Sequence, residues 1–385
     1  MTDQLDTDLA TLFAQPYDGD GGAITPPIVQ TSLFAFADYQ AFEDRMAGRT
    51  ADPIYSRVQN PTVAAFETMM ARAEGAEAGV GFASGMAAIS STLLAFLRPG
   101  DRVACVEHVY PDAYRLFERL LRPFGIEITY HPPAAFEDDP DLLKGTRIAY
   151  LESPSSLVFQ PLNLAKVAAH ARRHGALTVI DNSWATPVFQ RPSESGIDIV
   201  LHSASKYISG HSDTVAGVVI GSSDHIGQIR DLTLPLLGAK LAPFEAFLLL
   251  RGLRTLDVRM RRHQDTANHF VDRLAQMPQV TRIHSPGPNS VPGLAGRSGL
   301  LSFEFDPSVD IARFADGLRH FRLGVSWGGF ESLVLPAQVT LRQAGEQNAP
   351  QRFGVSDRLV RLSLGLESAD DLWADFMQAL TKSTG

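Results

Sequence analysis

The sequence predicts an α/β protein in which a large domain with a mostly parallel sheet is followed by a smaller α+β domain. Apolar runs of strand length alternate with segments of helical periodicity from residue 61 to about residue 250. A long charged helix that runs through Arg262 then opens a region with a different pattern. The chain has 385 residues, which is more than one typical domain contains.

The first helix of the large domain is predicted to begin at Pro61, with Asn60 as its N-terminal cap, and to end at Gly75. The elements that follow alternate in the way that βαβ units do, which favours a parallel sheet wrapped by helices. The predicted strands are residues 78–83, 102–106, 126–131, 147–152, 176–180, 197–201 and 215–221, and the predicted helices are residues 86–97, 112–121 and 164–174.

The N-terminal segment differs from the rest of the chain. Three glycines at positions 19, 21 and 22 and the pair Pro26-Pro27 interrupt any regular element. We therefore predict three parts: residues 1–60 form an N-terminal arm, residues 61–250 form the large domain, and residues 251–385 form the C-terminal domain.

Composition excludes several classes of protein. The chain has 34 basic and 43 acidic residues, and its net charge of −9 argues against a nucleic-acid partner. The single cysteine, Cys105, cannot form an internal disulfide, so we expect a reducing, cytoplasmic location. No apolar run approaches the roughly 18 residues that a membrane helix needs, and the acidic N-terminus lacks a signal pattern.

Lys206 is the most informative single residue, because an apolar segment leads to it and small hydroxyls surround it. A lysine whose cation is disfavoured by its surroundings can form a Schiff base with a carbonyl. If that carbonyl belongs to pyridoxal 5'-phosphate, a carboxylate must face the pyridinium nitrogen. Asp181, at the end of the predicted strand 176–180, is the candidate, although an Asp there can also cap a turn or helix.

A phosphate group would also need donors, and the sequence offers them at a transition from strand to helix. Ser84, Gly85 and Met86 stand at this transition, so the amides of Gly85 and Met86 would point at an anion. Ser203 and Ser205 add hydroxyls beside Lys206, although ordinary turn chemistry is the alternative interpretation of two serines near a strand end.

These residues lie within ordered motifs through which the chain resembles the Cys/Met-metabolism family of pyridoxal-phosphate enzymes, from about Pro53 to near the C-terminus. The resemblance implies a fold-type I PLP-dependent transferase fold, in which residues 61–250 would be the cofactor-binding domain. The motifs are Y-S-R-V-Q-N-P-T at 55–62, A-S-G-M-A-A at 83–88, L-E-S-P-S-S at 151–156, D-N-S-W-A-T-P at 181–187, D-I-V-L-H-S-A-S-K-Y-I-S-G-H-S at 198–212, R-G-L-R-T-L at 251–256, S-W-G-G-F-E-S-L at 326–333 and L-V-R-L-S-L-G-L-E at 359–367.

The resemblance assigns roles to further residues. Tyr110 would stack on the cofactor ring and steer protons, and Arg361 would clamp the substrate carboxylate in a two-pronged ion pair. Tyr55 and Arg57 would reach the phosphate of the neighbouring subunit, which implies at least a dimer and, by family likeness, a homotetramer built as a dimer of dimers. The substrate side would be lined by Ser156, Ser326 and Trp327.

Within the family the pattern is most similar to the cystathionine β-lyase branch, mainly through Trp327 and the pair Ser155-Ser156. We therefore expect a lyase that converts L-cystathionine to homocysteine, pyruvate and ammonia, a step of trans-sulfuration and methionine biosynthesis. The runner-up is γ-elimination or γ-replacement, as in methionine or cystathionine γ-lyase and cystathionine γ-synthase. A non-catalytic regulator that binds pyridoxal phosphate is the alternative from another class.

Two departures from the family pattern are notable. Serine stands at position 205, where threonine is usual, and the segment Y-P-D-A-Y at 110–114 replaces a Y-G-G-T-like segment of many relatives. We hypothesise that Asp112 meets the distal ammonium of cystathionine, since a carboxylate there prefers a cationic tail. The alternative is that Asp112 caps the helix that follows.

Other classes of site find less support. The segment G-V-G-F-A-S-G at 79–85 has one residue too many for a dinucleotide fingerprint, and no G-x-S-x-G elbow of a hydrolase is present. No metal site is expected, because the histidines lack an H-E-x-x-H or Cys/His ligand spacing. His202 and His211 are therefore interpreted as structural residues.

Overall fold

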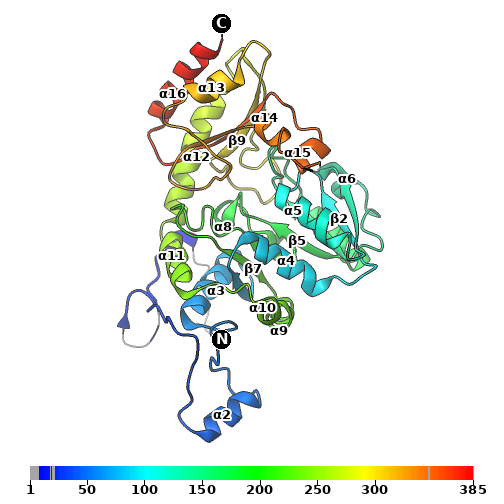
Figure 1. Ribbon diagram of the computed structural model, residues 1–385, viewed down its shortest axis with the longest axis vertical. Coiled ribbons are helices and arrows are strands. Elements are labelled where there is room, and N and C mark those ends of the chain that lie inside the picture. Colours follow the sequence, from blue (N-terminus) through cyan, green and yellow to red (C-terminus); the bar gives the residue numbers. More distant parts are fainter. Residues whose placement is uncertain (1–7, 18, 20–21, 346, 385) are drawn as a thin grey trace.

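The computed structural model describes residues 8–17, 19, 22–345 and 347–384. In this part of the chain the large domain contains a seven-stranded sheet, and all its neighbouring pairs are parallel except the two that involve β7. The prediction of a mostly parallel sheet is thereby confirmed (Figure 1). In spatial order the strands are β1 Ala78–Phe82, β7 Gly217–Gly221, β6 Ile199–His202, β5 Leu177–Asp181, β4 Ile148–Glu152, β2 Arg102–Val106 and β3 Glu127–His131.

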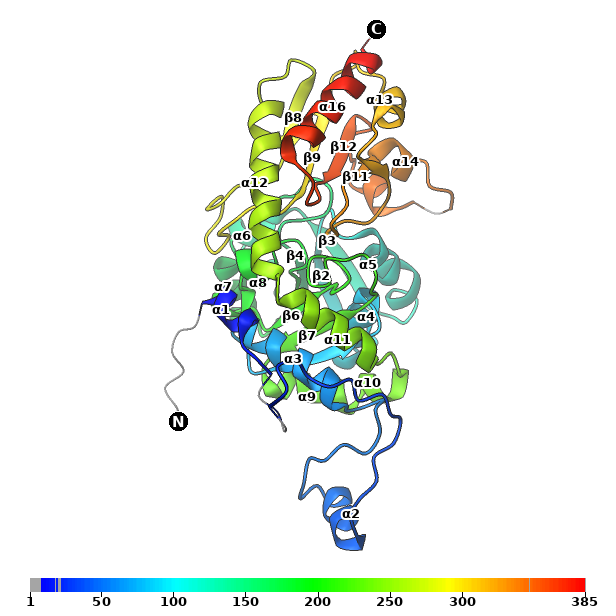
Figure 2. The same cartoon turned by 90° about the vertical axis from the view of Figure 1, so that its left-hand side faces the viewer.

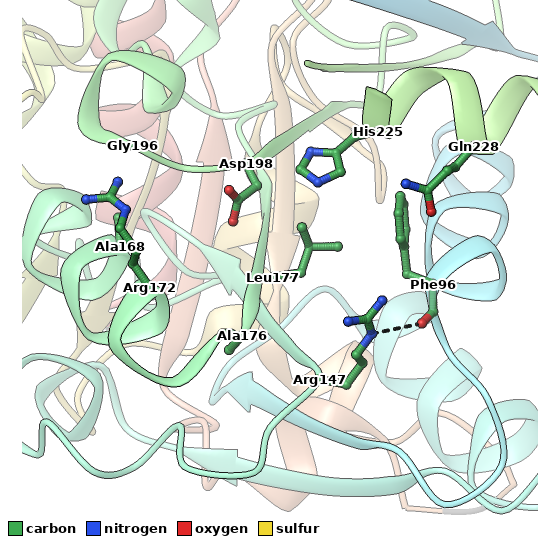
Figure 3. A pocket seen from close by; sticks show the side chains of 11 residues that line it. Phe96, Arg147, Ala168, Arg172, Ala176, Leu177, Gly196, Asp198, His225 and Gln228 are labelled. Carbon is green, nitrogen blue, oxygen red and sulfur yellow. Dashed lines mark hydrogen bonds between the residues drawn. The ribbon is translucent and has the colours of Figure 1, made fainter. Parts of the chain in front are cut away.

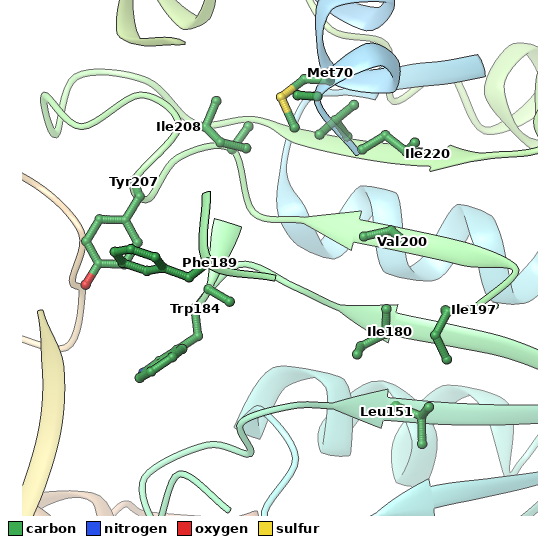
Figure 4. Close-up of a cluster of buried hydrophobic side chains, with 14 of the residues drawn as sticks. Met70, Leu151, Ile180, Trp184, Phe189, Ile197, Val200, Tyr207, Ile208 and Ile220 are labelled. Carbon is green, nitrogen blue, oxygen red and sulfur yellow. The ribbon is translucent and has the colours of Figure 1, made fainter. Parts of the chain in front are cut away.

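Helices cover both faces of this sheet, because its central strands are apolar on both sides. On one face, Met70 of α3 packs toward Val200, Ile220 and their neighbours (Figure 4). On the other face, α4 buries Ile89 and Leu93 against the strands. The helices of this domain are α3 Pro61–Glu74, α4 Gly85–Phe96, α5 Pro111–Leu116, the π-helical turn Phe117–Leu121, α6 Pro133–Asp138, α7 Leu164–His174, α8 Thr186–Phe189, the 3-10 turn Pro192–Ser195, α9 Ser223–Asp231, α10 Thr233–Leu237 and α11 Pro243–Leu253.

The carboxyl ends of β4, β5 and β6 lie next to one another at one edge of the sheet. Each strand ends in a polar residue after an apolar run: Glu152, Asp181 and His202 respectively. The register aligns Glu152 with Asp181 across β4 and β5. Since ligands of open α/β sheets bind at this edge, the topology gathers these side chains where a cofactor would be held.

A second, smaller sheet follows the long helix α12, Leu256–Leu274, which confirms the predicted α+β unit (Figures 1 and 2). An aromatic core that includes Phe270, Phe303 and Phe376 joins α12 and α16 to this sheet. The strands in spatial order are β10 Arg322–Leu323, β11 Leu333–Pro336, β12 Leu359–Ser363, β9 Leu300–Phe305 and β8 Val280–His284, and the helices are α13 Ile311–Gly317, α14 Ala337–Leu341, α15 Ala349–Arg352 and α16 Ala369–Ser383.

The N-terminal region has two parts that differ in their packing. The helix α1, Leu9–Ala14, buries Leu9, Leu12 and Phe13 in the core of the large domain. The helix α2, Tyr39–Met46, buries no residue and projects from the body (Figures 1 and 2). The two helices thus differ in how they pack on the large domain, and an arm over residues 1–60 stays a prediction.

Candidate active site

Lys206 lies in the turn after β6, and its amine points toward the C-terminal domain. Its Nζ donates a hydrogen bond of 2.8 Å to Ser326 Oγ and lies 5.4 Å from the centroid of the Trp327 ring. Burial and the positive charge of Arg361 lower the pKa of Lys206 to about 8, against the opposing effect of Asp181. An amine in this environment is unprotonated often enough near neutral pH to attack a carbonyl.

Asp181 lies at the end of β5, beside Lys206. Its Oδ1 accepts a hydrogen bond of 2.9 Å from the amide of Ser183, and burial raises the pKa of its carboxyl group. The described residues provide no ion pair for this carboxylate, and part of the side chain remains accessible. Because a partly buried acid needs a cation to remain charged, its environment fits a protonated pyridine nitrogen.

A buried polar network lies close to Asp181. His202 Nε2 and Asn182 Nδ2 contact Glu74 Oε1 at 2.6 Å and 3.1 Å, and all three residues are almost completely buried. This network fixes the ends of β5 and β6 to α3, which agrees with the interpretation of His202 as a structural residue.

In the predicted phosphate site, the start of α4 packs against the segment that carries Lys206. The hydroxyl oxygen of Ser84 caps the helix, because it accepts a hydrogen bond of 3.0 Å from the amide of Ala87. The amides of Gly85 and Met86 have no acceptor within the described part of the chain. A Cβ atom at Gly85 would lie 2.9 Å from Ser203 Cβ, so only glycine permits this approach. Free amides at a helix N-terminus beside a serine hydroxyl form a donor set suited to a phosphate.

Ser205 is placed differently from Ser203. Its hydroxyl donates to the carbonyl oxygen of Ala216 at 3.2 Å and accepts from the amide of Ala216 at 2.9 Å. These two bonds fix the turn that carries Lys206, which is a structural contribution. Its contact with a cofactor stays a prediction.

Tyr110 immediately precedes α5, and its two polar groups have different partners. Its amide donates to Glu152 Oε1 at 2.8 Å, and its hydroxyl donates to Asp112 Oδ2 at 2.9 Å. Burial and the neighbouring Asp112 carboxylate raise the pKa of the phenol above its usual value. The same carboxylate of Asp112 forms an ion pair with Arg115, so it already has two partners within the chain.

Glu152 is a residue of the site that the sequence interpretation did not single out. It is buried at the end of β4, and burial together with the negative charge of Asp181 raises the pKa of its carboxyl group well above the usual value. A signal was available, because Glu152 ends a predicted strand of the same sheet as Asp181.

Arg361 lies in β12 and is buried without a carboxylate partner among the described residues. Its Nη2 donates to the carbonyl oxygens of Val325 and Ser326 at 2.8 Å and 3.1 Å, whereas its Nε has no acceptor in the described structure. Burial lowers the pKa of its guanidinium to about 10. A buried donor that lacks a partner fits a ligand, and a carboxylate matches the guanidinium best.

The remaining predicted substrate residues lie around this crevice. Ser326 accepts from Lys206, and Trp327 packs on Tyr207 with ring centroids 5.6 Å apart. Ser156 is partly buried, and its amide donates to the carbonyl oxygen of His108 at 2.7 Å. The structure thus brings Ser326 and Trp327 to Lys206, while the contact of Ser156 with a substrate stays a prediction.

Tyr55 and Arg57 lie on the arm side of α3. Tyr55 forms a β-bridge with Leu33, and the guanidinium of Arg57 lies 5.2 Å from the centroid of the Tyr55 ring. The contacts recorded for the pair are thus within the N-terminal segment of their own chain.

A cavity of about 340 Å³ lies at the opposite edge of the sheet (Figure 3). Its lining residues Arg147, Leu177 and Asp198 stand at the amino ends of β4, β5 and β6, away from Lys206. Within the described residues no helix is long and apolar enough to cross a membrane, and no His, Cys, Asp and Glu cluster suits a metal ion.

A mostly parallel sheet whose carboxyl edge unites a lysine, a carboxylate and a helix N-terminus defines the class: a fold-type I pyridoxal-phosphate enzyme. Within this class, the chain belongs to the family described as Cys/Met metabolism PLP-dependent enzyme, which matches residues 10–381. The family resemblance seen in the sequence is thereby confirmed, and pyridoxal 5'-phosphate is the cofactor.

Individual relatives extend over almost the whole chain. It is 40% identical over 375 residues to an L-methionine gamma-lyase of Pseudomonas putida, with 94% of each chain covered. It is 34% identical to a cystathionine beta-lyase of Lactococcus lactis subsp. cremoris, with 95% of this chain and 96% of the relative covered. A solved structure of a cystathionine gamma-lyase from Lactobacillus plantarum superposes with a TM-score of 0.88, at 32% identity and 98% and 99% coverage.

These comparisons support a pyridoxal-phosphate-dependent carbon–sulfur lyase of the trans-sulfuration kind. Both β- and γ-lyases occur among the relatives, so the comparisons do not distinguish between the two reactions.

Proposed function

We propose that the chain catalyses the α,β-elimination of L-cystathionine to homocysteine, pyruvate and ammonia. The observation that carries this proposal is the position of the Lys206 amine, which Ser326 holds at 2.8 Å beside the Trp327 ring. β-Elimination needs the removal of a proton from Cα alone, whereas γ-elimination also requires proton transfer at Cβ. Lys206, held beside the position of Cα, would suffice as the base for this shorter sequence of proton transfers.

Each residue of the site would contribute one step. Pyridoxal phosphate supplies an electron-withdrawing ring that accepts the electron pair released at Cα. Lys206 would hold this group through its aldehyde and then take the Cα proton, while Asp181 keeps the ring nitrogen protonated. Arg361 would bind the substrate carboxylate and so orient the Cα–H bond.

Two features of the sequence separate the proposed reaction from its alternatives. By resemblance, γ-lyases tend to carry asparagine at the position of Ser156, and synthases lack the S-W-G-G-F segment at 326–330. The 40% identity to a methionine gamma-lyase favours γ-elimination as the second candidate.

The keto acid formed from L-cystathionine identifies the reaction. We expect pyruvate and homocysteine, because the bond from sulfur to Cβ of the cysteine half would break. γ-Elimination would instead give 2-oxobutyrate and cysteine, and chromatography of the keto acids separates the two. A predominance of 2-oxobutyrate would refute β-elimination, and the absence of any keto acid from cystathionine or other thioethers would favour the non-catalytic regulator.

We also propose that Tyr55 and Arg57 complete the phosphate site of a neighbouring subunit. The arm offers a surface for such an association, because Leu33, Tyr39 and Met46 are 62%, 80% and 65% exposed. Exposed apolar side chains concentrated on a projecting segment are typical of a contact with another chain. The working unit would then be a dimer, and two dimers would form the homotetramer.

Co-expression of two impaired variants tests this arrangement. Arg57→Ala should lower activity about 10- to 100-fold through loss of a phosphate contact, and Lys206→Ala removes the reactive amine. In a mixed dimer, one of the two sites would combine an intact Lys206 with an intact Arg57 of the partner. Because random pairing makes about half of the dimers mixed, co-expression should restore roughly a quarter of the wild-type activity.

Arg49→Ala is the matched control, because Arg49 lies on the same arm but pairs with Asp44 at 2.6 Å. It should retain activity. No recovery in mixed dimers that chromatography shows to have formed would mean that Arg57 acts within its own subunit.

A further inference from the structure

We propose that Asp112 is a positioning residue, which holds the hydroxyl of Tyr110 and is itself held by Arg115. The proposal rests on the proposed elimination reaction, in which Tyr110 lies beside the cofactor. It goes beyond that reaction because it assigns a task to the segment 110–114, where this chain departs from the Y-G-G-T-like pattern of many relatives.

The geometry is a continuous chain of polar contacts. The Tyr110 hydroxyl donates to Asp112 Oδ2 at 2.9 Å, and the other oxygen, Oδ1, forms an ion pair with Arg115 Nη1. Arg115 Nη2 donates to Gln343 Oε1 at 2.6 Å. Since residues 110–115 belong to the large domain and Gln343 follows α14, the chain of contacts links the tyrosine to the C-terminal domain.

The local backbone makes this arrangement possible. Pro111 starts α5, so Asp112 lies in the first helical turn, and Arg115 follows three residues later on the same face. No side chain caps this helix, so the structure does not show the alternative role of Asp112 as a helix cap. Its carboxylate is instead directed to Tyr110 and Arg115.

A cavity of about 250 Å³ lies beside these contacts, between α5 and the segment that follows α14. Arg115 and Gln343 both line it, together with Tyr114 and Asn348. The Arg115–Gln343 contact therefore joins the two sides of this cavity.

Several charged groups act on the Tyr110 phenol. Asp112 on α5, Glu152 at the end of β4 and Asp181 at the end of β5 all favour its neutral form, and Arg361 on β12 is the cation that faces it. Asp112 alone among the three acids also forms a hydrogen bond with the hydroxyl. Among the three acids, removal of Asp112 should therefore change the acidity of Tyr110 most.

The consequence concerns proton transfer to sulfur. A phenol that remains protonated across the neutral pH range can donate a proton to the leaving sulfur atom, but it cannot act as a base. When the C–S bond breaks, its electron pair goes to sulfur. The Lys206 ammonium, which had taken the Cα proton, would supply a proton to sulfur through the Tyr110 hydroxyl, so that the phenol stays neutral and the protons balance over the turnover.

The sign of the pH effect follows from the charges. Burial and Asp112 raise the pKa of Tyr110, so loss of the Asp112 charge must lower it. In Asp112→Asn the phenolate should appear at a pH about one unit lower than in the wild type.

The experiment follows phenolate absorption in the near ultraviolet during a pH titration of the holoenzyme. The contribution of Tyr110 is the difference between each protein and the same protein with Tyr110→Phe. Arg115→Gln is the matched variant, since it breaks the same ion pair but leaves the Asp112 charge in place. Asp257→Asn controls for the loss of an ion pair elsewhere, because Asp257 pairs with Arg261 at 2.8 Å on α12.

We expect the titration of Tyr110 to move to lower pH in Asp112→Asn and not in Arg115→Gln or Asp257→Asn. An unchanged titration in Asp112→Asn would overturn the proposal, and so would an equal shift in Arg115→Gln, which would implicate the loop and not the carboxylate. If Asp112→Asn changed only KM for cystathionine, Asp112 would be the substrate contact inferred from the sequence. The titration needs no turnover, so its result stands even if the elimination reaction proves to be another one.

Discussion

Lys206→Ala should reduce keto-acid formation by a factor of about 10⁴ or more, since it removes both the attachment point of the cofactor and the base that takes the Cα proton. The lowered pKa of about 8 and the contact with Ser326 at 2.8 Å support the proposed role of this amine. Neither function can be taken over by Ser326 or Trp327, because neither side chain carries an amine.

The measurement is pyruvate release together with the visible absorption band of the bound cofactor. Lys166→Ala is the matched control, because Lys166 is an exposed lysine that pairs with Asp138 at 3.3 Å, and it should leave both signals unchanged. Retention of the visible band and of more than a few per cent of activity in Lys206→Ala would show that another amine holds the cofactor.

Arg361→Lys should raise KM for the amino-acid substrate by about 100-fold with a smaller change in kcat, because lysine keeps the charge but loses the planar pair of donors. The effect should be large because Arg361 is buried and its Nε has no partner among the described residues. The lysine would also leave the carbonyl oxygens of Val325 and Ser326 without their donor.

Initial rates at a range of cystathionine concentrations check this expectation. Arg358→Lys is the control, because Arg358 lies just before the same strand but donates to the carbonyl oxygens of Asp306 and Val309. It should lower thermal stability and leave KM near the wild-type value. An Arg361→Lys enzyme with an unchanged KM would exclude the arginine as the carboxylate clamp.

The sequence predicted the fold well because its strands carry a strong local signal. The segments that became β5 and β6 are apolar runs followed by polar residues, and their ends give the positions of Asp181 and of the loop of Lys206 directly. Arg361 and the cofactor were found through motifs, since periodicity alone does not distinguish a buried strand arginine from a surface one.

Other features depend on contacts between distant residues and left no local pattern. The buried Glu152 accepts from the amide of Tyr110, which lies 42 residues away, and the link from Arg115 to Gln343, which is 228 residues away, forms only when the two domains meet. The predicted helix 112–121 is interrupted, because its second half adopts π-helical hydrogen bonds. The burial of α1 was also missed, since six residues give too short a pattern to indicate a docked helix.

The network of Glu74, His202 and Asn182 has a practical consequence for anyone who maps this enzyme by random mutagenesis. Its members touch no reactant, yet water cannot replace a lost partner at zero exposure, so a truncated side chain leaves an uncompensated polar group in the interior. In a screen that scores colonies for growth, substitutions at these three positions would therefore lower growth as strongly as substitutions of Lys206. A measurement of the amount of folded protein would distinguish variants that fail to fold from variants that fold but lack catalytic activity.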